Sequence, residues 1–477
     1  MSLYLVYVPM WLVDFMIEEK FPAQNYKKNI LEDCFEDAKK YFLEPLIQVD
    51  FAHAIMLGEQ GIITEAEQKV ILKALRSLNL EEINKAQYDG TFEDLFYYLQ
   101  REITKNCDGD VDTSGKLHTA RSRNDIDVTI YRLYLRPKLL ELIEEAMTLR
   151  ANLLNLASEH HETLIPAYTH TQPAQPTTMA HYLLAMAENL GRDIKRLQSA
   201  YENMNYCPMG AAAITTTGFP INRHRVAELL GFTAPTVNAY GSISSIDYFT
   251  VMLGAMSAML VNIGKFAQEF LLMAMMEFNV VRLPDGFVQG SSIMPQKRNP
   301  VALEHIRAIA SKALGESLGV FTAVHNTPFG DINDSEDDIQ PLIYHALRDA
   351  TRAVSLFAAT LKSAKFNLET LRQRAEANFI TVTELADSIV RKENLPFRIS
   401  HKIVGNCVKI AYENKTEITY ELLQNVAKDV IGRELNFTEE ELNQTLTAEY
   451  FVSIRTIYGG SAPVETKRAL GVERDLE

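Results

Sequence analysis

The chain has 477 residues, 47% of them hydrophobic and 23% charged, and this ordinary composition excludes disordered, collagen-like and fibrous proteins. Lys and Arg number 47 against 62 Asp and Glu, and the net charge of −15 argues against a general nucleic-acid-binding protein. Four cysteines are scattered along the chain, so neither a disulfide framework nor a Cys-rich zinc site is expected. Reduced thiols in a cytoplasm fit this pattern better.

The N-terminus begins with an apolar run, residues 3–17, which Pro9 and Asp14 interrupt. A secretory signal requires a basic flank before the apolar run and small residues at a cleavage site. Neither feature is present, so we expect no export signal.

Helical periodicity dominates the rest of the chain, and strand patterns are brief and isolated, as at residues 4–8. We therefore predict a mostly α fold. The uncharged stretch 248–264 reaches the lower length limit for a membrane span, but its polar residues and glycines favour a buried helix. Because 249–281 is apolar on nearly every side, we also predict a homo-oligomer. Long helices are expected near 137–161, 177–204, 247–281, 301–326 and 338–363.

Loop composition marks breaks between these helices, and the helices become shorter and more polar after residue 365. The breaks lie at 106–116, 205–222 and 283–300. The predicted division is an N-terminal helical domain (1–115), a central long-helix domain (116–365) and a small C-terminal helical domain (366–477).

The segment LHTARSRND, residues 117–125, precedes a helical run and contains Arg121 and Arg123 beside Ser122 and Asn124. Guanidinium groups bind carboxylates through two parallel hydrogen bonds, and an Asn amide adds a donor and an acceptor. The alternative is a solvated helix start with Asp125 as its cap.

Two further segments interrupt the helical pattern. In YTHTQPAQPTT, residues 168–178, two prolines stiffen a loop that holds His170, and the next helix starts at the Thr pair. His170 is an acid/base candidate, although a lone His is more often structural. In GSSIMPQKRNP, residues 290–300, Ser, Lys and Asn between two prolines make an anion-binding loop more plausible than an ordinary surface loop.

GSSIMPQKRNP resembles the signature loop of the fumarase/aspartase superfamily, G-S-S-x-M-P-x-K-x-N-P, at every fixed position. LHTARSRND is similar to the argininosuccinate lyase motif L-H-T-G-R-S-R-N-D, with Ala120 in place of Gly. The resemblance implies a three-domain subunit, a homotetramer whose active sites are each shared by three subunits, and anti elimination that releases fumarate from a succinyl group. No metal-ligand or nucleotide-binding motif occurs in the sequence, so neither a metal nor a cofactor is expected.

The resemblance also implies roles by motif position. Ser291 would remove the Cβ proton, helped by loop amides and nearby positive charge. His170 would protonate the departing amine, and Glu304 would orient His170. The remaining motif residues, Ser122, Arg123, Asn124, Thr169, Ser292, Lys297 and Asn299, would bind the succinyl carboxylates, because extra negative charge develops there.

This chain departs from the argininosuccinate lyase pattern mainly outside those motifs. Ala212 and Thr216 replace glycines, and Ile246 stands where the family has Arg. PFGDINDSEDD, residues 328–338, lacks the family's Tyr, Gln and Lys, so the half of the site that distinguishes the leaving group is rebuilt. We predict a carbon–nitrogen lyase for an N-succinyl amino compound, with a cationic amine attracted by this acid-rich loop. A solvated loop that never meets substrate is the equal alternative.

Three other functions remain open at this point. The first is true argininosuccinate lyase of arginine biosynthesis, and the second is a non-catalytic structural homologue, which the complete set of motif residues disfavours. The third is aspartase or adenylosuccinate chemistry, which the RSRND segment opposes. Fumarate or an N-succinyl amine is the expected small-molecule partner, with no nucleic acid, no membrane and a cytoplasmic location.

Overall fold

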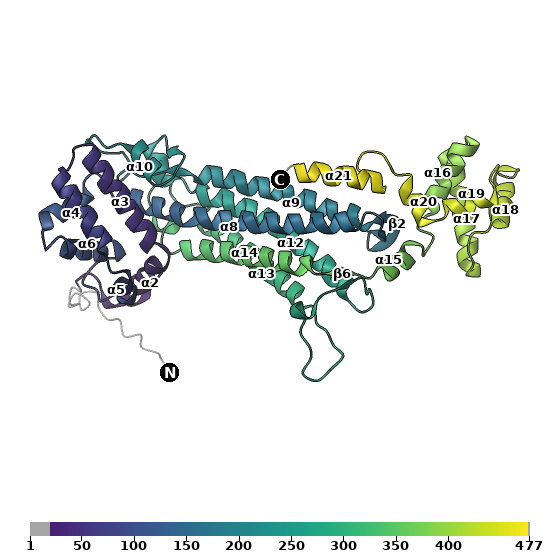
Figure 1. Cartoon of the computed structure of the whole chain (residues 1–477), viewed down its shortest axis with the longest axis horizontal. Helices are drawn as coiled ribbons and strands as arrows, with labels where there is room; N and C mark the ends of the chain where they lie inside the picture. The colour runs from purple at the N-terminus through teal and green to yellow at the C-terminus, as the bar shows by residue number, and fades with distance from the viewer. Residues whose placement is uncertain (1–19, 476–477) are drawn as a thin grey trace, which may run out of the picture. The chain divides into compact units, whose positions relative to one another are not determined.

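The computed structural model describes residues 20–475, so the predictions for the apolar run 3–17 and the short strand 4–8 lie outside the described residues. The described part is mostly helical, as predicted (Figure 1). Five helices of 23 to 37 residues dominate it. They are α8 (Arg123–Glu159), α9 (Met179–Met204), α12 (Asp247–Ala274), α13 (Val301–Val324) and α14 (Gln340–Lys362).

The chain divides into two compact units, and each long helix contributes residues to both. The first unit contains residues up to 140, 197–255 and 315–348. Its shorter helices are α1 (Gln24–Tyr26), a π-helix (Lys27–Leu31), α2 (Glu32–Tyr41), α3 (Leu43–Glu59), α4 (Glu65–Arg76), α5 (Leu80–Lys85), α6 (Leu95–Asn106), α7 (Val111–Gly115), α10 (Arg223–Leu229) and α11 (Ala239–Ser244). Its two short strands, β3 (Tyr206–Cys207) and β4 (Ala234–Pro235), pair in parallel.

The second unit contains residues 141–196, 256–314 and 349–477. Its strands form two antiparallel pairs, β1 (Leu164–Thr169) with β2 (Gln172–Thr178) and β5 (Val281–Arg282) with β6 (Lys365–Phe366). Its shorter helices are α15 (Leu368–Ala375), α16 (Val382–Glu393), α17 (Phe397–Asn414), α18 (Tyr420–Ile431), α19 (Glu439–Thr445), α20 (Ala448–Ser453) and α21 (Pro463–Asp475). Leu385, Ile403 and Leu423 belong to a separate apolar cluster formed by α16 to α19. The three-domain division stays a prediction.

Two local predictions need correction. Residues 168–178 form most of a β-hairpin rather than an irregular loop, because a two-stranded ribbon has outer edges where Pro173 and Pro176 need not donate a hydrogen bond. Residues 106–116 are not all loop, since α7 forms there with Asp110 as its N-cap, accepting the Thr113 N–H at 3.0 Å.

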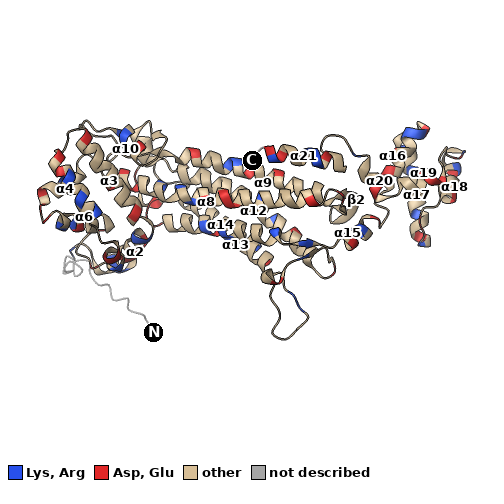
Figure 2. Cartoon of the chain, in the orientation of Figure 1, with Lys and Arg blue, Asp and Glu red and all other residues tan. Residues whose placement is uncertain are grey.

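Helix α12 carries few charges along its length (Figure 2), and it is the one described helix long and apolar enough to cross a membrane. A helix in the core of a soluble protein meets the same test. Only 44% of its most apolar window is buried within the chain, with Val251 43% and Val261 49% exposed. Part of the apolar surface of α12 is therefore exposed in the single chain.

Three residues that stand where related motifs have Gly adopt left-handed backbone conformations. The φ angles are 61° at Ala120, 53° at Ala212 and 67° at Thr216. A side chain in this region crowds the backbone, and a β-branched residue such as Thr is the least favourable of the three. Local strain is therefore present at positions where Gly would fit without it.

Thr216→Gly is expected to raise the free energy of unfolding by up to about 1 kcal/mol, because relief of the left-handed strain exceeds the added entropy of the unfolded chain. The urea midpoint measures this change. Thr215→Gly is the matched control, since Thr215 is equally exposed but has no positive φ, and it should lower stability. A loss of stability in both variants would contradict the strain argument.

Candidate active site

Ser122 precedes α8, and Arg123 and Asn124 are its first two residues; together they form the Ser122–Asn124 turn, in which a hydrogen bond orients the Asn amide. The Ser122 hydroxyl donates to the Asn124 Oδ1 at 2.7 Å. The amide nitrogen of Asn124 therefore remains available as a donor, which is the group that a ligand carboxylate requires. The capping alternative is also correct in part, because the Asp125 carboxylate accepts the Ser122 N–H at 2.9 Å.

The two arginines of this segment have different environments. Arg121 is buried, and its guanidinium binds the buried Asp50 carboxylate at 2.5 Å, so it holds α3 rather than a substrate. Arg123 is partly exposed and pairs with Asp94 at 2.6 Å and Glu93 at 3.0 Å. These pairs fix the guanidinium beside the Ser122–Asn124 turn.

The β1–β2 hairpin places His170 at its tip. His170 and Thr171 both have left-handed backbones, with φ 49° and 63°, and the Thr171 hydroxyl donates to the His170 carbonyl at 2.6 Å. Thr169 ends β1, and both Thr169 and His170 are exposed. The tight turn therefore presents the imidazole to solvent on a two-stranded support.

The connection between α12 and α13 is a long loop (Figure 1) that includes Ser291, Ser292, Lys297 and Asn299. The N–H groups of Ile293 and Met294 donate to the Ser291 Oγ at 3.3 and 3.1 Å. Backbone bonds of 3.0 and 2.8 Å between Gln289 and Asn299 close the loop at its base. The family resemblance implies that loop amides assist this serine, and the role itself stays a prediction.

Within the described residues of one chain, no hydrogen bond joins His170, Ser291 and Glu304, although all three belong to the second unit. Glu304 lies exposed in the first turn of α13, where its N–H contacts the Pro300 carbonyl at 3.4 Å. Lys297 and Ser292 are exposed as well. The structure therefore presents three preformed groups of candidate residues, each on its own element.

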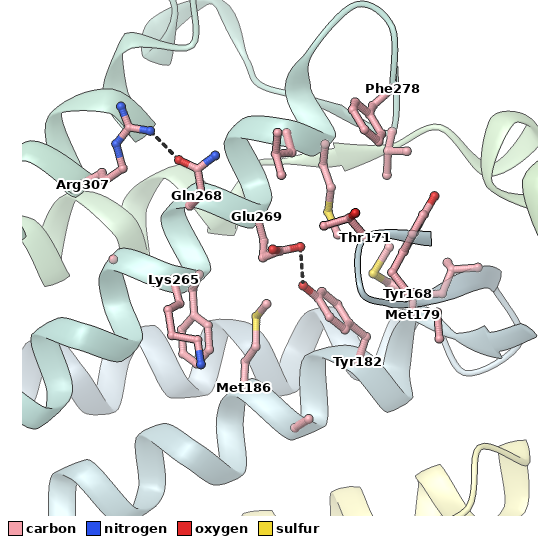
Figure 3. A pocket seen from close by; sticks show the side chains of 18 of the residues that line it. Tyr168, Thr171, Met179, Tyr182, Met186, Lys265, Gln268, Glu269, Phe278 and Arg307 are labelled. Carbon is pink, nitrogen blue, oxygen red and sulfur yellow. Dashed lines mark hydrogen bonds between the residues drawn. The ribbon is translucent and has the colours of Figure 1, made fainter. Parts of the chain in front are cut away.

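A cavity of about 960 Å³ lies in the second unit beside the hairpin (Figure 3). Tyr168 and Thr171 line it from the hairpin, and mostly apolar residues of α9, α12 and α13 form the remaining wall. Inside it, the Tyr182 hydroxyl donates to the Glu269 carboxylate at 3.4 Å. Burial and the Glu269 charge both raise the pKa of Tyr182, so this phenol stays protonated.

The acid-rich loop lies against α8 in the first unit. The Tyr131 hydroxyl of α8 donates to the Asp337 carboxylate at 3.1 Å. Burial, the hydrogen bond to Asp331 and the Asp331 charge raise the pKa of Glu336 to about 8. Burial and the charges of Asp337 and Glu336 raise the pKa of Asp127 well above its usual range. The carboxyl groups of Asp127, Glu336 and Asp337 thus gather near Arg123, which lies one helical turn from Asp127. Together they could balance more positive charge than Arg123 supplies.

Sequence reasoning noted Asp125 only as a possible cap. Its side chain is fully buried, and its second oxygen accepts the N–H groups of Gly210 and Ala212 at 2.8 and 2.9 Å. The S-x-x-D spacing was a visible sign of the contact with Ser122. The contact across 85 residues had no local sign in the sequence.

Comparison with known proteins identifies the family. Residues 51–315 match the family model described as a lyase, and residues 379–453 match the argininosuccinate lyase C-terminal model. Argininosuccinate lyase 2 of Agrobacterium fabrum is 40% identical over 95% of this chain and 91% of its own length. Argininosuccinate lyase of Methanosarcina mazei is 36% identical over 91% of this chain and 87% of its own.

Among solved structures, an EDDS lyase in complex with formate has a TM-score of 0.84 at 30% identity, covering 95% of this chain and 90% of that one. A variant EDDS lyase with bound fumarate has a TM-score of 0.83, also at 30% identity and with the same coverage. A class II fumarase from Schistosoma mansoni, at 17% identity and a TM-score of 0.70 over 85% of this chain and 89% of that one, shares the fold. The chain belongs to the lyase family of the fumarase/aspartase superfamily. Within that superfamily it is a carbon–nitrogen lyase of the argininosuccinate lyase-like branch.

Proposed function

We propose that this lyase releases fumarate from an N-succinyl amino compound by anti β-elimination, and adds an amine to fumarate in reverse. The observation that carries the proposal is the pair of N–H groups directed at the Ser291 Oγ. A serine hydroxyl is a poor base, and N–H donors stabilise the oxyanion that it must become in order to take a Cβ proton. The EDDS lyase variant with bound fumarate supports the same product for this chain.

The Cβ proton next to a carboxylate is barely acidic, so its removal requires that the carboxylate accept additional negative charge. Asn124 and Arg123 supply an amide donor and a fixed guanidinium, while Ser122 orients the amide. Thr169, Ser292, Lys297 and Asn299 complete this cradle in the proposal. His170 protonates the leaving amine, and Glu304 orients its imidazole.

The leaving amine is proposed to be cationic. Asp127, Glu336 and Asp337 gather near Arg123, and their pKa values are raised first by burial and then by the negative charge of neighbouring carboxylates, which a cation would offset. Argininosuccinate contains a guanidinium group, so this reading also accommodates true argininosuccinate lyase activity, which the relatives' names favour. The rebuilt 328–338 loop favours a different amine.

The active assembly is proposed to be a homotetramer whose sites each draw on three subunits. The three groups of candidate residues lie on separate elements, and α12 leaves apolar surface uncovered within one chain. Val261, which also lines the 960 Å³ cavity, belongs to that surface. A second copy of this chain covers both in the proposal. The cytoplasm is the proposed location, consistent with four free cysteines.

Ser291→Ala is expected to lower kcat for fumarate-plus-amine addition by about 10²- to 10⁴-fold, because the variant lacks the proposed base. Loss of fumarate absorbance across a panel of amines measures the reaction. Ser77→Ala is a control that should retain turnover, because Ser77 is the C-cap residue of α4 in the first unit, whereas Ser291 belongs to the second unit. Near-normal turnover of Ser291→Ala would contradict the assignment of the base.

At pH 9, where a carboxyl group with a pKa of about 8 is mostly ionised, Glu336→Gln is expected to lower kcat/KM for a diamine about fivefold relative to an amino alcohol of equal length. The reason is that roughly 1 kcal/mol of attraction to the second, charged amine is lost. The ratio of the two amines is the measurement. Asp334→Asn is the matched control, since Asp334 is exposed on the same loop. An unchanged ratio in Glu336→Gln would support the solvated-loop alternative.

Val261→Asp is expected to convert the tetramer to smaller species, because burying an unpaired carboxylate in a helical interface costs several kcal/mol or more. Sedimentation velocity measures the assembly, and activity should fall with it. Val111→Asp is the control, since Val111 is 68% exposed on α7. A wild-type chain that sediments as a monomer at micromolar concentration would contradict the shared-site proposal.

A further inference from the structure

Asp125 connects two segments that the proposed reaction treats as separate. Its Oδ1 accepts the N–H of Ser122 in the turn before α8, at 2.9 Å. Its Oδ2 accepts the N–H groups of Gly210 and Ala212, at 2.8 and 2.9 Å. The residue is 0% exposed, so these three donors take the place of solvent around a buried carboxylate.

The loop on the far side of Asp125 is held from two directions. The Arg223 guanidinium donates to the carbonyls of Met209 and Pro208, at 3.0 and 3.3 Å, while Asp125 accepts the N–H groups. A Cβ on Gly210 would lie 2.6 Å from the Arg223 side chain, so only Gly fits at this position. The backbone of Gly210–Ala212 is therefore fixed relative to α10. Because Asp125 accepts hydrogen bonds from this backbone and from the Ser122 N–H, it also fixes Ser122 relative to α10.

The geometry points to Asp125 as a positioning residue for the carboxylate cradle: it anchors the Ser122–Asn124 turn to the Gly210–Ala212 loop. The inference rests on the proposed function, since the cradle is assigned there. Ser122 in turn donates to Asn124, so a shift of the Ser122 backbone would misdirect the Asn124 amide. Displacements of about 1 Å at a site can cost about 10²-fold in rate.

The negative charge of Asp125 matters for this role, because three N–H donors require two acceptor oxygens. A protonated carboxyl places a hydrogen against one of those donors, and an Asn side chain places its NH₂ there. Burial raises the pKa of Asp125 to about 6, although the N–H groups and Arg121 oppose the shift. The other charged or titratable groups facing it are Arg223 of α10 and the Cys207 thiol of β3.

The test measures fumarate binding by calorimetry at pH 7.5 and 5.5, where fumarate remains a dianion, in a His170→Asn protein that lacks the proposed acid/base side chain. If only the ionised Asp125 supports the cradle, Kd should rise about fourfold between pH 7.5 and 5.5, as a group titrating near pH 6 requires. Adding Asp125→Asn to this protein should raise the Kd for fumarate at pH 7.5 at least fourfold and should abolish the pH dependence of Kd.

Thr129→Val is the matched control, because its buried hydroxyl donates to the Asp125 carbonyl at 2.6 Å without touching the carboxylate. It should lower the melting temperature yet keep the fumarate affinity and its pH dependence. If the protein with Asp125→Asn binds fumarate as tightly as the His170→Asn protein, the inference is overturned. If the variant with Asp125→Asn does not fold, the same Kd for fumarate at pH 7.5 and 5.5 in the His170→Asn protein overturns it. A wild-type chain without fumarate binding or turnover would instead refute the proposed function.

Discussion

A carboxylate buried without water must be surrounded by donors, and Asp125 meets this requirement by joining segments 85 residues apart. Asp50 does the same nearby, binding the buried Arg121 guanidinium from α3. These two contacts fix both ends of the short segment Arg121–Asp125. Removing one partner from such a buried pair leaves the other uncompensated, so the segment has little freedom to move. These two contacts therefore make the Ser122–Asn124 part of the candidate carboxylate cradle rigid.

The same segment shows how neighbouring residues of one type divide their roles. Arg121 points inward to Asp50, whereas Arg123 stays partly exposed and is fixed by Asp94 and Glu93. Arg121 precedes α8, whereas Arg123 is its first residue, so the two side chains leave the backbone in different local conformations. The two carboxylates beside Arg123 offset its positive charge, and the nearby acid-rich loop adds further negative charge. The first unit thus combines directed donors with an excess of negative charge, which suits a substrate that has an anionic and a cationic end.

The sequence predicted four of the five long helices and the family motifs closely, because periodic apolar residues and strict signature spacing are local properties. Helix α13, for example, begins at Val301 directly after the GSSIMPQKRNP loop. The predicted start of α8 was wrong, since the helix begins at Arg123 rather than near 137. The hairpin was missed because prolines in β2 argue against a strand, and only the pairing with β1 shows that their missing N–H groups face outward. The second contact of Asp125 was missed because long-range pairing leaves no mark on local sequence. The roles of Ser291, His170 and the other candidate residues stay predictions.

Backbone strain occurs in segments that carry candidate residues or contact them. Five of the eleven non-glycine residues with positive φ in the described part lie there: Ala120 before the Ser122–Asn124 turn, His170 and Thr171 at the hairpin tip, and Ala212 and Thr216 in the loop that Asp125 holds. Such conformations cost about 1 to 3 kcal/mol each and persist only where surrounding contacts fix them. Asp125 provides such a contact at Ala212, and the hairpin ladder provides it at His170. The contacts that maintain these strained conformations also fix the direction of nearby donors. Donors that are already oriented do not have to turn as negative charge develops, which lowers the reorganisation energy of the proposed reaction.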